Sequence, residues 1–169
     1  MGRHHTALVD PGARLGTGVA VGPFAVVEAE TGIGDGCELG AHSVVKRYTW
    51  MGARNRVHAG AILGGEPQDL GFGGGPSRLE IGDDNRIREG VTIHRATAPG
   101  GVTRVGSGCF LMAYSHVAHE DVIGDHVILA NNVALAGHVR IDERAFLSGG
   151  VVVHQFCRVG RLAMVGGNT

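Results

Sequence analysis

The sequence has almost no excess charge, few cysteines and no long apolar run, and each shortage excludes a class of protein. Fifteen basic residues nearly balance 16 acidic ones, which gives a formal net charge of −1 and no basic surface for nucleic acid. No apolar run approaches the roughly 20 residues of a membrane-spanning helix, and the start MGRHHTALVD lacks an apolar signal-peptide core. Three cysteines far apart in sequence favour reduced thiols in the cytoplasm over a disulfide framework.

Proline and aromatic residues are also scarce, whereas glycine is abundant. The chain has 30 glycines against 5 prolines and 5% aromatic residues, which indicates a backbone that turns often. Aliphatic residues recur every six positions from Val9 to Val165. Of the 27 positions in this frame, 24 hold an aliphatic residue or methionine, and the exceptions are Asp69, Gly75 and Pro99. Neither a helix nor an ordinary strand keeps such a period.

A period of six residues, with a small residue two positions before each aliphatic one, is typical of a hexapeptide β-helix. We therefore predict an all-β fold in which residues 1–169 form one parallel β-helix domain. Three hexapeptides make one triangular coil, and the aliphatic side chains stack inside it. The left-handed winding is taken from hexapeptide proteins as a class. Cys37, Cys109 and Cys157 occupy the small-residue site, so we expect them to pack in the interior.

Two segments interrupt the frame without shifting it, residues 64–80 and 96–104. Inserts that leave a solenoid coil usually lie on one face and often carry function. A flexible connector would also be rich in glycine, so the first insert, which begins GGEPQDL, is compatible with either role.

The coil length also brings distant polar residues into one column. With three hexapeptides per coil, His119 lies over Gly137 and His154 lies over Ala136. We expect most of the polar side chains to face outward, because aliphatic residues take the inward positions. The column on three successive coils contains His119, Glu120, Gly137, His138, His154 and Gln155.

Two kinds of chemistry fit this column. Histidines spaced as His116 and His119, with further histidines nearby, can ligate zinc. However, zinc-dependent carbonic anhydrases of this fold use two histidines five residues apart, and no pair in this chain has that spacing. Proton transfer is the stronger hypothesis, because a neutral histidine can act as a general base and a neighbouring carboxylate such as Glu120 can hold its tautomer. The backbone N–H of Gly137 could then stabilise an oxyanion.

Several motifs in order along the chain strongly resemble the UDP-N-acetylglucosamine O-acyltransferase family. They are QDL (68–70), IGDDNRIREGVTIHRAT (81–97), SHVAHE (115–120), LANNVALAGH (129–138), HQFCRVG (154–160) and MVGG (164–167). The resemblance implies a left-handed β-helix that assembles as a homotrimer, with active sites in the clefts between subunits. It also implies transfer of an R-3-hydroxyacyl chain from acyl carrier protein to the 3-hydroxyl of UDP-N-acetylglucosamine, the first step of lipid A synthesis. No cofactor or metal is implied.

The same resemblance assigns roles by motif. His119 matches the general base, Glu120 its partner, and Gly137 the oxyanion donor. Gly167 matches the position that limits acyl length, and as glycine it would leave room for a longer chain. Residues matching those that contact the nucleotide sugar or shape the cleft are Gln68, Asp69, His116, His138, His154 and Gln155.

The chain departs from the family pattern in three places. Glu120 stands where the family often has aspartate, and Gly71 stands where it commonly has lysine. The family also carries a helical C-terminal domain, and we expect that domain to be absent here. These departures leave two alternatives open: a related enzyme with a different acceptor, such as a 3-amino sugar nucleotide, and a non-catalytic or zinc-dependent β-helix protein.

Overall fold

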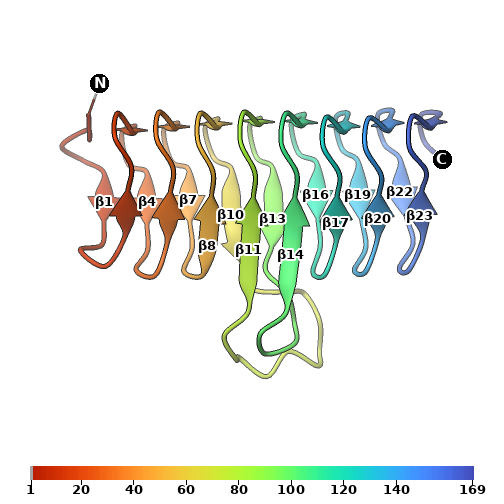
Figure 1. The fold of residues 1–169 in the computed structure, drawn as a ribbon, viewed down its shortest axis with the longest axis horizontal. Helices are drawn as coiled ribbons and strands as arrows, with labels where there is room; N and C mark the ends of the chain where they lie inside the picture. Colours follow the sequence, from red (N-terminus) through yellow and green to blue (C-terminus); the bar gives the residue numbers. More distant parts are fainter. Residues whose placement is uncertain (1) are drawn as a thin grey trace.

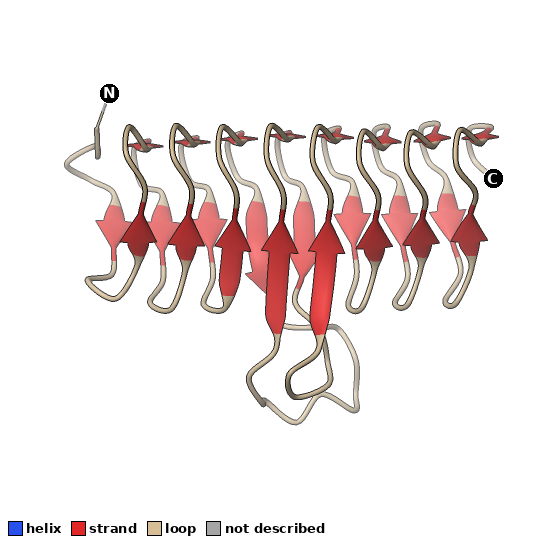
Figure 2. Cartoon of the chain, viewed as in Figure 1, coloured by secondary structure: helices blue, strands red, loops and turns tan. Residues whose placement is uncertain are grey.

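The computed structural model describes residues 2–169, and the chain winds as a left-handed parallel β-helix with three sheets as its walls (Figure 1). The secondary structure in this range consists of short strands joined by turns (Figure 2). The predicted fold class is therefore confirmed. Among residues 2–169, no helix has the length and apolarity that crossing a membrane requires.

Each sheet contains eight parallel strands, and every third strand along the chain belongs to the same sheet. The first sheet consists of β1 (Leu8–Val9), β4 (Val26–Val27), β7 (Val44–Val45), β10 (Ile62–Gly65), β13 (Thr92–His94), β16 (His116–Val117), β19 (Ala134–Leu135) and β22 (Val152–Val153). The second consists of β2 (Arg14–Leu15), β5 (Gly32–Ile33), β8 (Thr49–Met51), β11 (Arg78–Ile81), β14 (Val102–Val105), β17 (Val122–Ile123), β20 (Arg140–Ile141) and β23 (Arg158–Val159). The third consists of β3 (Ala20–Val21), β6 (Glu38–Leu39), β9 (Arg56–Val57), β12 (Arg86–Ile87), β15 (Phe110–Leu111), β18 (Ile128–Leu129), β21 (Phe146–Leu147) and β24 (Met164–Val165).

The strand register gives the length of each coil. Val26 pairs with Val44, so an uninterrupted coil is three hexapeptides long. Ile62 pairs with Thr92 across the first insert, and Thr92 pairs with His116 across the second. These pairings make the two interrupted coils five and four hexapeptides long. Because the inserts add whole hexapeptides, the aliphatic frame stays intact.

The predicted inward positions form a continuous apolar core. Burying each such side chain contributes about 1.5–3 kcal/mol, so the stacked column is the main source of stability. The expectation fails at the ends: Leu15 is 37% exposed, and Val9, Val159 and Val165 are only partly buried. Cys37 and Cys109 are buried as expected, whereas Cys157 is exposed. The physical reason is the same, because within residues 2–169 the first and last coils pack against a neighbouring coil on one side only.

The turns require glycine at one position because of close backbone approach, and a left-handed residue at another. Gly34 directly follows an inward aliphatic residue, and a side chain there would overlap the backbone of Gly52 in the next coil. A different position of the turn is left-handed, and it holds glycine at some turns, such as Gly18 (φ 71°), and a polar residue at many others, including Glu120 (φ 55°) and His138 (φ 63°). This backbone conformation costs roughly 1–2 kcal/mol for a residue with a side chain.

Both inserts leave the helix at the turn between the first and second sheets, which we call the insert corner. The loops cover residues 66–77 and 95–101, and in Figure 1 they hang below β11 and β14. Both loops are shorter than the expected inserts, 64–80 and 96–104, although the second loop begins one residue earlier than expected. The flanking strands extend into the expected inserts and pair there, as Leu79 does with Thr103. The turns that carry the predicted histidine column, after β16, β19 and β22, lie on this same corner.

Candidate active site

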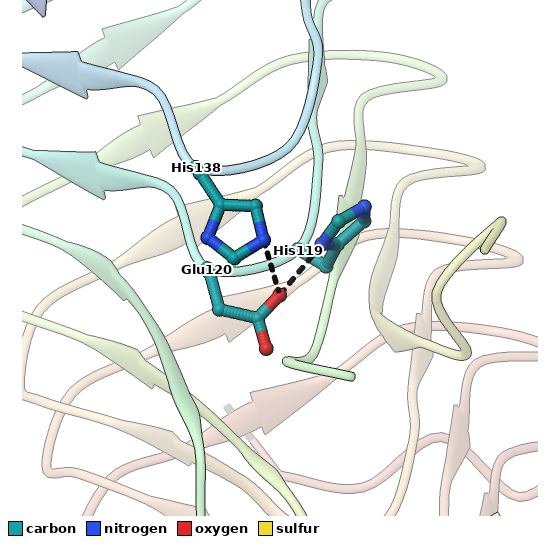
Figure 3. A group of neighbouring side chains, drawn as sticks. All are labelled: His119, Glu120 and His138. Carbon is teal, nitrogen blue, oxygen red and sulfur yellow. Dashed lines mark hydrogen bonds and ion pairs between the residues drawn. The ribbon is translucent and has the colours of Figure 1, made fainter. Parts of the chain in front are cut away.

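A hydrogen-bonded dyad of His119 and Glu120 lies at the centre of the insert corner (Figure 3). The imidazole Nδ1 of His119 is 2.6 Å from Glu120 Oε2. A carboxylate at this distance accepts a hydrogen bond from the N–H at Nδ1, so the lone pair of the neutral ring is on Nε2. The arrangement therefore prepares Nε2 of His119 to accept a proton.

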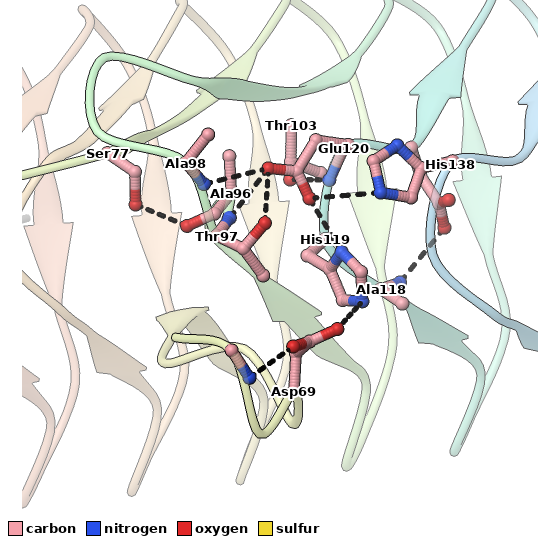
Figure 4. Close-up of polar contacts among 12 residues, drawn as sticks. Asp69, Ser77, Ala96, Thr97, Ala98, Thr103, Ala118, His119, Glu120 and His138 are labelled. Carbon is pink, nitrogen blue, oxygen red and sulfur yellow. Dashed lines mark hydrogen bonds and ion pairs between the residues drawn. The ribbon is translucent and has the colours of Figure 1, made fainter. Parts of the chain in front are cut away.

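Glu120 is held in turn by the second loop (Figure 4). Its Oε1 accepts hydrogen bonds from the N–H of Thr97 at 2.7 Å, the hydroxyl of Thr97 at 2.8 Å and the N–H of Ala98 at 3.1 Å. Burial raises the pKa of Glu120, but the donors at Ala98, Thr97 and His119 outweigh it and leave this pKa below its ordinary value. Glu120 is therefore a carboxylate at neutral pH, as its role beside His119 requires.

Asp69 closes the other side of the His119 ring. It lies on the first loop, and its Oδ2 is 3.7 Å from Nε2 of His119, beyond hydrogen-bond length. Its Oδ1 accepts the N–H of Gly71 at 2.6 Å. Although predicted to face outward, His119 is only 5% exposed. Asp69 and Glu120 therefore flank the two ring nitrogens of His119.

Gly137 lies against the His119 ring, one coil further on. A side chain at Gly137 would overlap the imidazole, so only glycine permits this approach. Within residues 2–169, the N–H of Gly137 has no hydrogen-bond acceptor. A free N–H beside a proposed base is suited to stabilising an oxyanion.

His138 completes the group on this coil. Its ring is edge-on to that of His119, with centroids 5.3 Å apart, and its Nε2 is 3.9 Å from Glu120 Oε2. The ring of His138 also stacks on that of Phe156, with ring centroids 4.8 Å apart. Phe156 is thus the neighbour of His138 in the next coil, as the coil length of three hexapeptides requires.

The remaining predicted residues lie at different distances from the dyad. Gln68, His154 and Gln155 do not hydrogen-bond to His119 or Glu120 within the described chain, and both His154 and Gln155 are exposed. Gly167 follows β24, at the turn between the third and first sheets, next to Gly149. In one copy of the chain, Gly167 is therefore on a different corner from His119.

A buried histidine that the sequence analysis missed extends the site. His94 is 8% exposed, and its ring is edge-on to that of the predicted His116, with centroids 4.7 Å apart. Burial lowers the pKa of His94 to about 4, and His116 and His119 contribute to the same shift. Burial also lowers the pKa of His116, whose Nδ1 is 2.7 Å from the hydroxyl of Thr92. Both rings are therefore neutral at pH 7.

Arg95, also missed, anchors the first loop. Its guanidinium is buried and donates to the carbonyl of Gly75 at 2.9 Å and to Ser77 Oγ at 3.1 Å. The same group lies over the ring of Phe72, 4.9 Å from its centroid. Because these contacts hold the loop that carries Asp69, Arg95 indirectly determines the approach to His119.

A pocket of about 380 Å³ lies between the two loops. Asp69, Gly71, Thr97 and Ala98 contribute to its walls, so it adjoins the dyad. A larger pocket of about 870 Å³ lies over the third sheet, between Arg3 and Phe110, and includes none of the site residues. The smaller pocket is the one placed for chemistry at His119.

The spacing of His119, Glu120 and His138 would also allow a metal ion, since one ligand atom from each lies within 4.8 Å of the others. However, Oε2 of Glu120 is already hydrogen-bonded to Nδ1 of His119, and His138 is too distant to share that bond. We interpret the group as a base with its carboxylate partner and an adjacent imidazole.

Comparisons with known proteins point to one kind of enzyme. No family model matches the chain. The acyl-[acyl-carrier-protein]–UDP-N-acetylglucosamine O-acyltransferase of Synechocystis sp. is 57% identical over 124 residues, which cover 73% of this chain and 45% of the relative. This chain thus spans about half the length of the curated relatives it matches.

Solved structures agree. The UDP-N-acetylglucosamine acyltransferase of Francisella novicida superimposes with a TM-score of 0.97 at 40% identity, covering 99% of this chain and 62% of that one. The UDP-N-acetylglucosamine acyltransferase of Campylobacter jejuni gives a TM-score of 0.86 at 31% identity, covering 99% of this chain and 72% of that one.

Proposed function

Because the chain belongs to the UDP-N-acetylglucosamine acyltransferase family, we propose that it transfers an R-3-hydroxyacyl chain from acyl carrier protein to the 3-hydroxyl of UDP-N-acetylglucosamine. This reaction would be the first step of lipid A synthesis. The observation that carries the proposal is the His119–Glu120 dyad. Glu120 is hydrogen-bonded to Nδ1 of His119, and Nε2 of the same ring lies on the side of Asp69.

In the proposed mechanism, Nε2 of His119 removes the proton from the 3-hydroxyl as the sugar oxygen attacks the thioester carbonyl. The N–H of Gly137 donates to the oxyanion that forms. When the carbon–sulfur bond breaks, the thiolate of the carrier leaves and takes the proton from His119. General-base catalysis typically contributes 10²–10⁴ in rate, and an oxyanion donor on the order of 10²–10³.

The acyl group passes directly between the two substrates in this mechanism. Among residues 2–169, no serine or cysteine side chain hydrogen-bonds to His119, so His119 activates neither kind of nucleophile. No cofactor or metal takes part. The remaining site residues, Gln68, His116, His138, His154 and Gln155, contact the sugar nucleotide or shape its cleft.

We further propose that the active unit is a homotrimer in the cytoplasm, where acyl carrier protein delivers the donor. Residues 1–169 provide its β-helical domain. The position of Gly167 on a corner away from His119 fits a site shared between subunits, with Gly167 of one copy at the acyl groove of another.

The test is an assay with UDP-N-acetylglucosamine and R-3-hydroxyacyl carrier protein, with the product identified by mass spectrometry. We expect an ester at the 3-hydroxyl, and we expect His119→Ala to lower turnover by at least about 10². Absence of transfer by the intact protein would reject the proposal. A near-normal rate for His119→Ala would remove His119 from its role as base.

One observation favours a second acceptor. The pocket beside the dyad has Asp69 on its wall and Gly71 where the family commonly has lysine. A carboxylate without that cation suits an amino group as well as a hydroxyl. The ratio of kcat/KM for UDP-N-acetylglucosamine and its 3-amino analogue decides between them. Stoichiometric zinc in the purified protein would instead support the zinc-dependent alternative.

A further inference from the structure

Asp121 is the only buried carboxyl group in residues 2–169. It is fully inaccessible and occupies the small-residue site of its coil, directly after the dyad. A buried carboxyl is costly unless hydrogen bonds compensate for the lost water. Asp121 does not hydrogen-bond to the proposed base His119, to its partner Glu120 or to the oxyanion donor Gly137.

The two oxygens of Asp121 contact two different coils. Oδ2 accepts the N–H of Ala118 at 2.9 Å, and Oδ1 accepts the N–H of Val139 at 2.7 Å. Ala118 immediately precedes His119, and Val139 immediately follows His138. One carboxyl group therefore ties the turn of the proposed base to the turn of the proposed oxyanion donor.

This tie replaces an ordinary turn bond. In comparable turns the N–H at the small-residue site donates to the carbonyl three residues earlier, as Val133 does to Ala130 and Ala145 to Asp142. Within the described residues, Val139 makes no such bond to Ala136. The shape of the turn that contains Gly137 thus depends on a side chain from the preceding coil.

A similar brace elsewhere uses an amide. Asn55 Oδ1 accepts the N–H of Asn85, and Asn85 Oδ1 accepts the N–H of Cys109. The amide of Asn55 also donates to the carbonyl of Gly52, three residues earlier. An asparagine therefore fits this site and can brace the next coil, but it presents an N–H where Asp121 presents a second acceptor.

We propose that Asp121 is a positioning residue, whose carboxyl group keeps His119 in register with the N–H of Gly137. The inference rests on the proposed function, because register matters only if these two groups act on one reacting carbonyl. A displacement of about 1 Å can cost on the order of 10² in rate. In the proposed mechanism, Asp121 touches neither substrate nor the reacting atoms.

The decisive variant is Asp121→Asn, with Asn85→Ala as the matched control that removes a brace from a turn between the second and third sheets. We expect Asp121→Asn to lower kcat at least about tenfold, to change each KM less than about threefold, and to speed hydrogen exchange at Ala118. Asn85→Ala should lower the melting temperature yet leave kcat within about twofold of the original. A kcat for folded Asp121→Asn within twofold of the original overturns the proposal.

If Asp121→Asn does not fold, Asp121→Thr takes its place, because threonine occupies the same site at Thr31 and Thr103. The brace can also be tested without turnover, by the ¹⁵N resonances of the His119 ring. If the original protein transfers no acyl group, the proposed function fails. The positioning role of Asp121 is then tested by the ¹⁵N resonances of the His119 ring. These should shift in Asp121→Asn and stay unchanged in Asn85→Ala, and unchanged resonances in Asp121→Asn overturn the positioning role.

Discussion

The imidazole of His119 lies so close to Gly137 that one added methyl group would overlap the ring. Gly137→Ala should therefore displace His119 and lower kcat by about 10², with little change in stability. Steady-state kinetics and circular dichroism measure the two effects. Gly160→Ala is the matched control, because nothing lies within 4 Å of a side chain added there. Equal activity of both variants would contradict the contact.

Glu120→Gln tests the tautomer of His119. If the amide oxygen keeps the bonds to Thr97 and Ala98, its N–H₂ faces Nδ1 of His119 and moves the ring proton to Nε2. We expect kcat to fall by roughly 10²–10⁴ with the melting temperature nearly unchanged. Glu120→Asp keeps the charge and should lose less. Undiminished turnover in Glu120→Gln would exclude the dyad from catalysis.

Arg95→Lys tests the anchoring of the first loop. Lysine lacks the planar guanidinium that lies over Phe72 while its Nη1 donates to Gly75 and Ser77, so the loop carrying Asp69 should loosen. We expect the KM for the sugar nucleotide to rise about tenfold, and hydrogen exchange to speed up in residues 66–77. Arg104→Lys, which changes an exposed arginine paired with Glu80, should alter neither quantity. The anchoring role is wrong if the KM stays the same.

The stability of the fold should depend on the ionisation of Asp121. Burial raises the pKa of Asp121 to about 8 from an ordinary value of 3.8, against the opposing effect of the N–H groups of Val139 and Ala118. Between these values the folded protein binds more protons than the unfolded chain. The free energy of unfolding should therefore fall as pH rises from about 4 to about 8.

Urea unfolding at pH 5 and pH 8 checks this dependence. The difference in unfolding free energy between the two pH values should be smaller in Asp121→Asn, which lacks the titrating group. An identical difference in both proteins would mean that Asp121 keeps an ordinary pKa.

The coil architecture was predictable because one physical requirement repeats along the chain. Each inward side chain must stack on the one a coil away, so the frame through Val27, Val45 and Leu63 is visible in the sequence. The frame does not reveal how well each coil is covered. Leu15 and Cys157 obey the pattern and are nonetheless exposed, because packing needs a neighbour on both sides.

The site was predictable where regular coils form it. The regular coil length alone places His119 beside Gly137 and His138, and the structure brings these residues together. His94 escaped detection because its coil contains the second insert. Counting the added hexapeptide, through the pairing of Ile93 with Val117, would have placed His94 next to the dyad.

Contacts made by the loops could not be predicted in this way. The bonds from Thr97 and Ala98 to Glu120, and from Arg95 to the first loop, depend on the path of irregular backbone. No period in the sequence encodes that path. The burial of His119 beneath the loops follows from the same local folding.

The pairing of Val26 with Val44 determines how coils could be added to this β-helix. Each coil advances the chain by about 4.8 Å, so the span between two groups is counted in whole turns. Tandem duplication of residues 24–41 would lengthen the β-helix and leave the reactive groups as they are. Duplication of the single coil that joins His119 to Gly137 would instead separate them by one more turn. Coils can therefore be added near residues 24–41 without moving the site, whereas the proposed chemistry requires that His119 and Gly137 stay one coil apart.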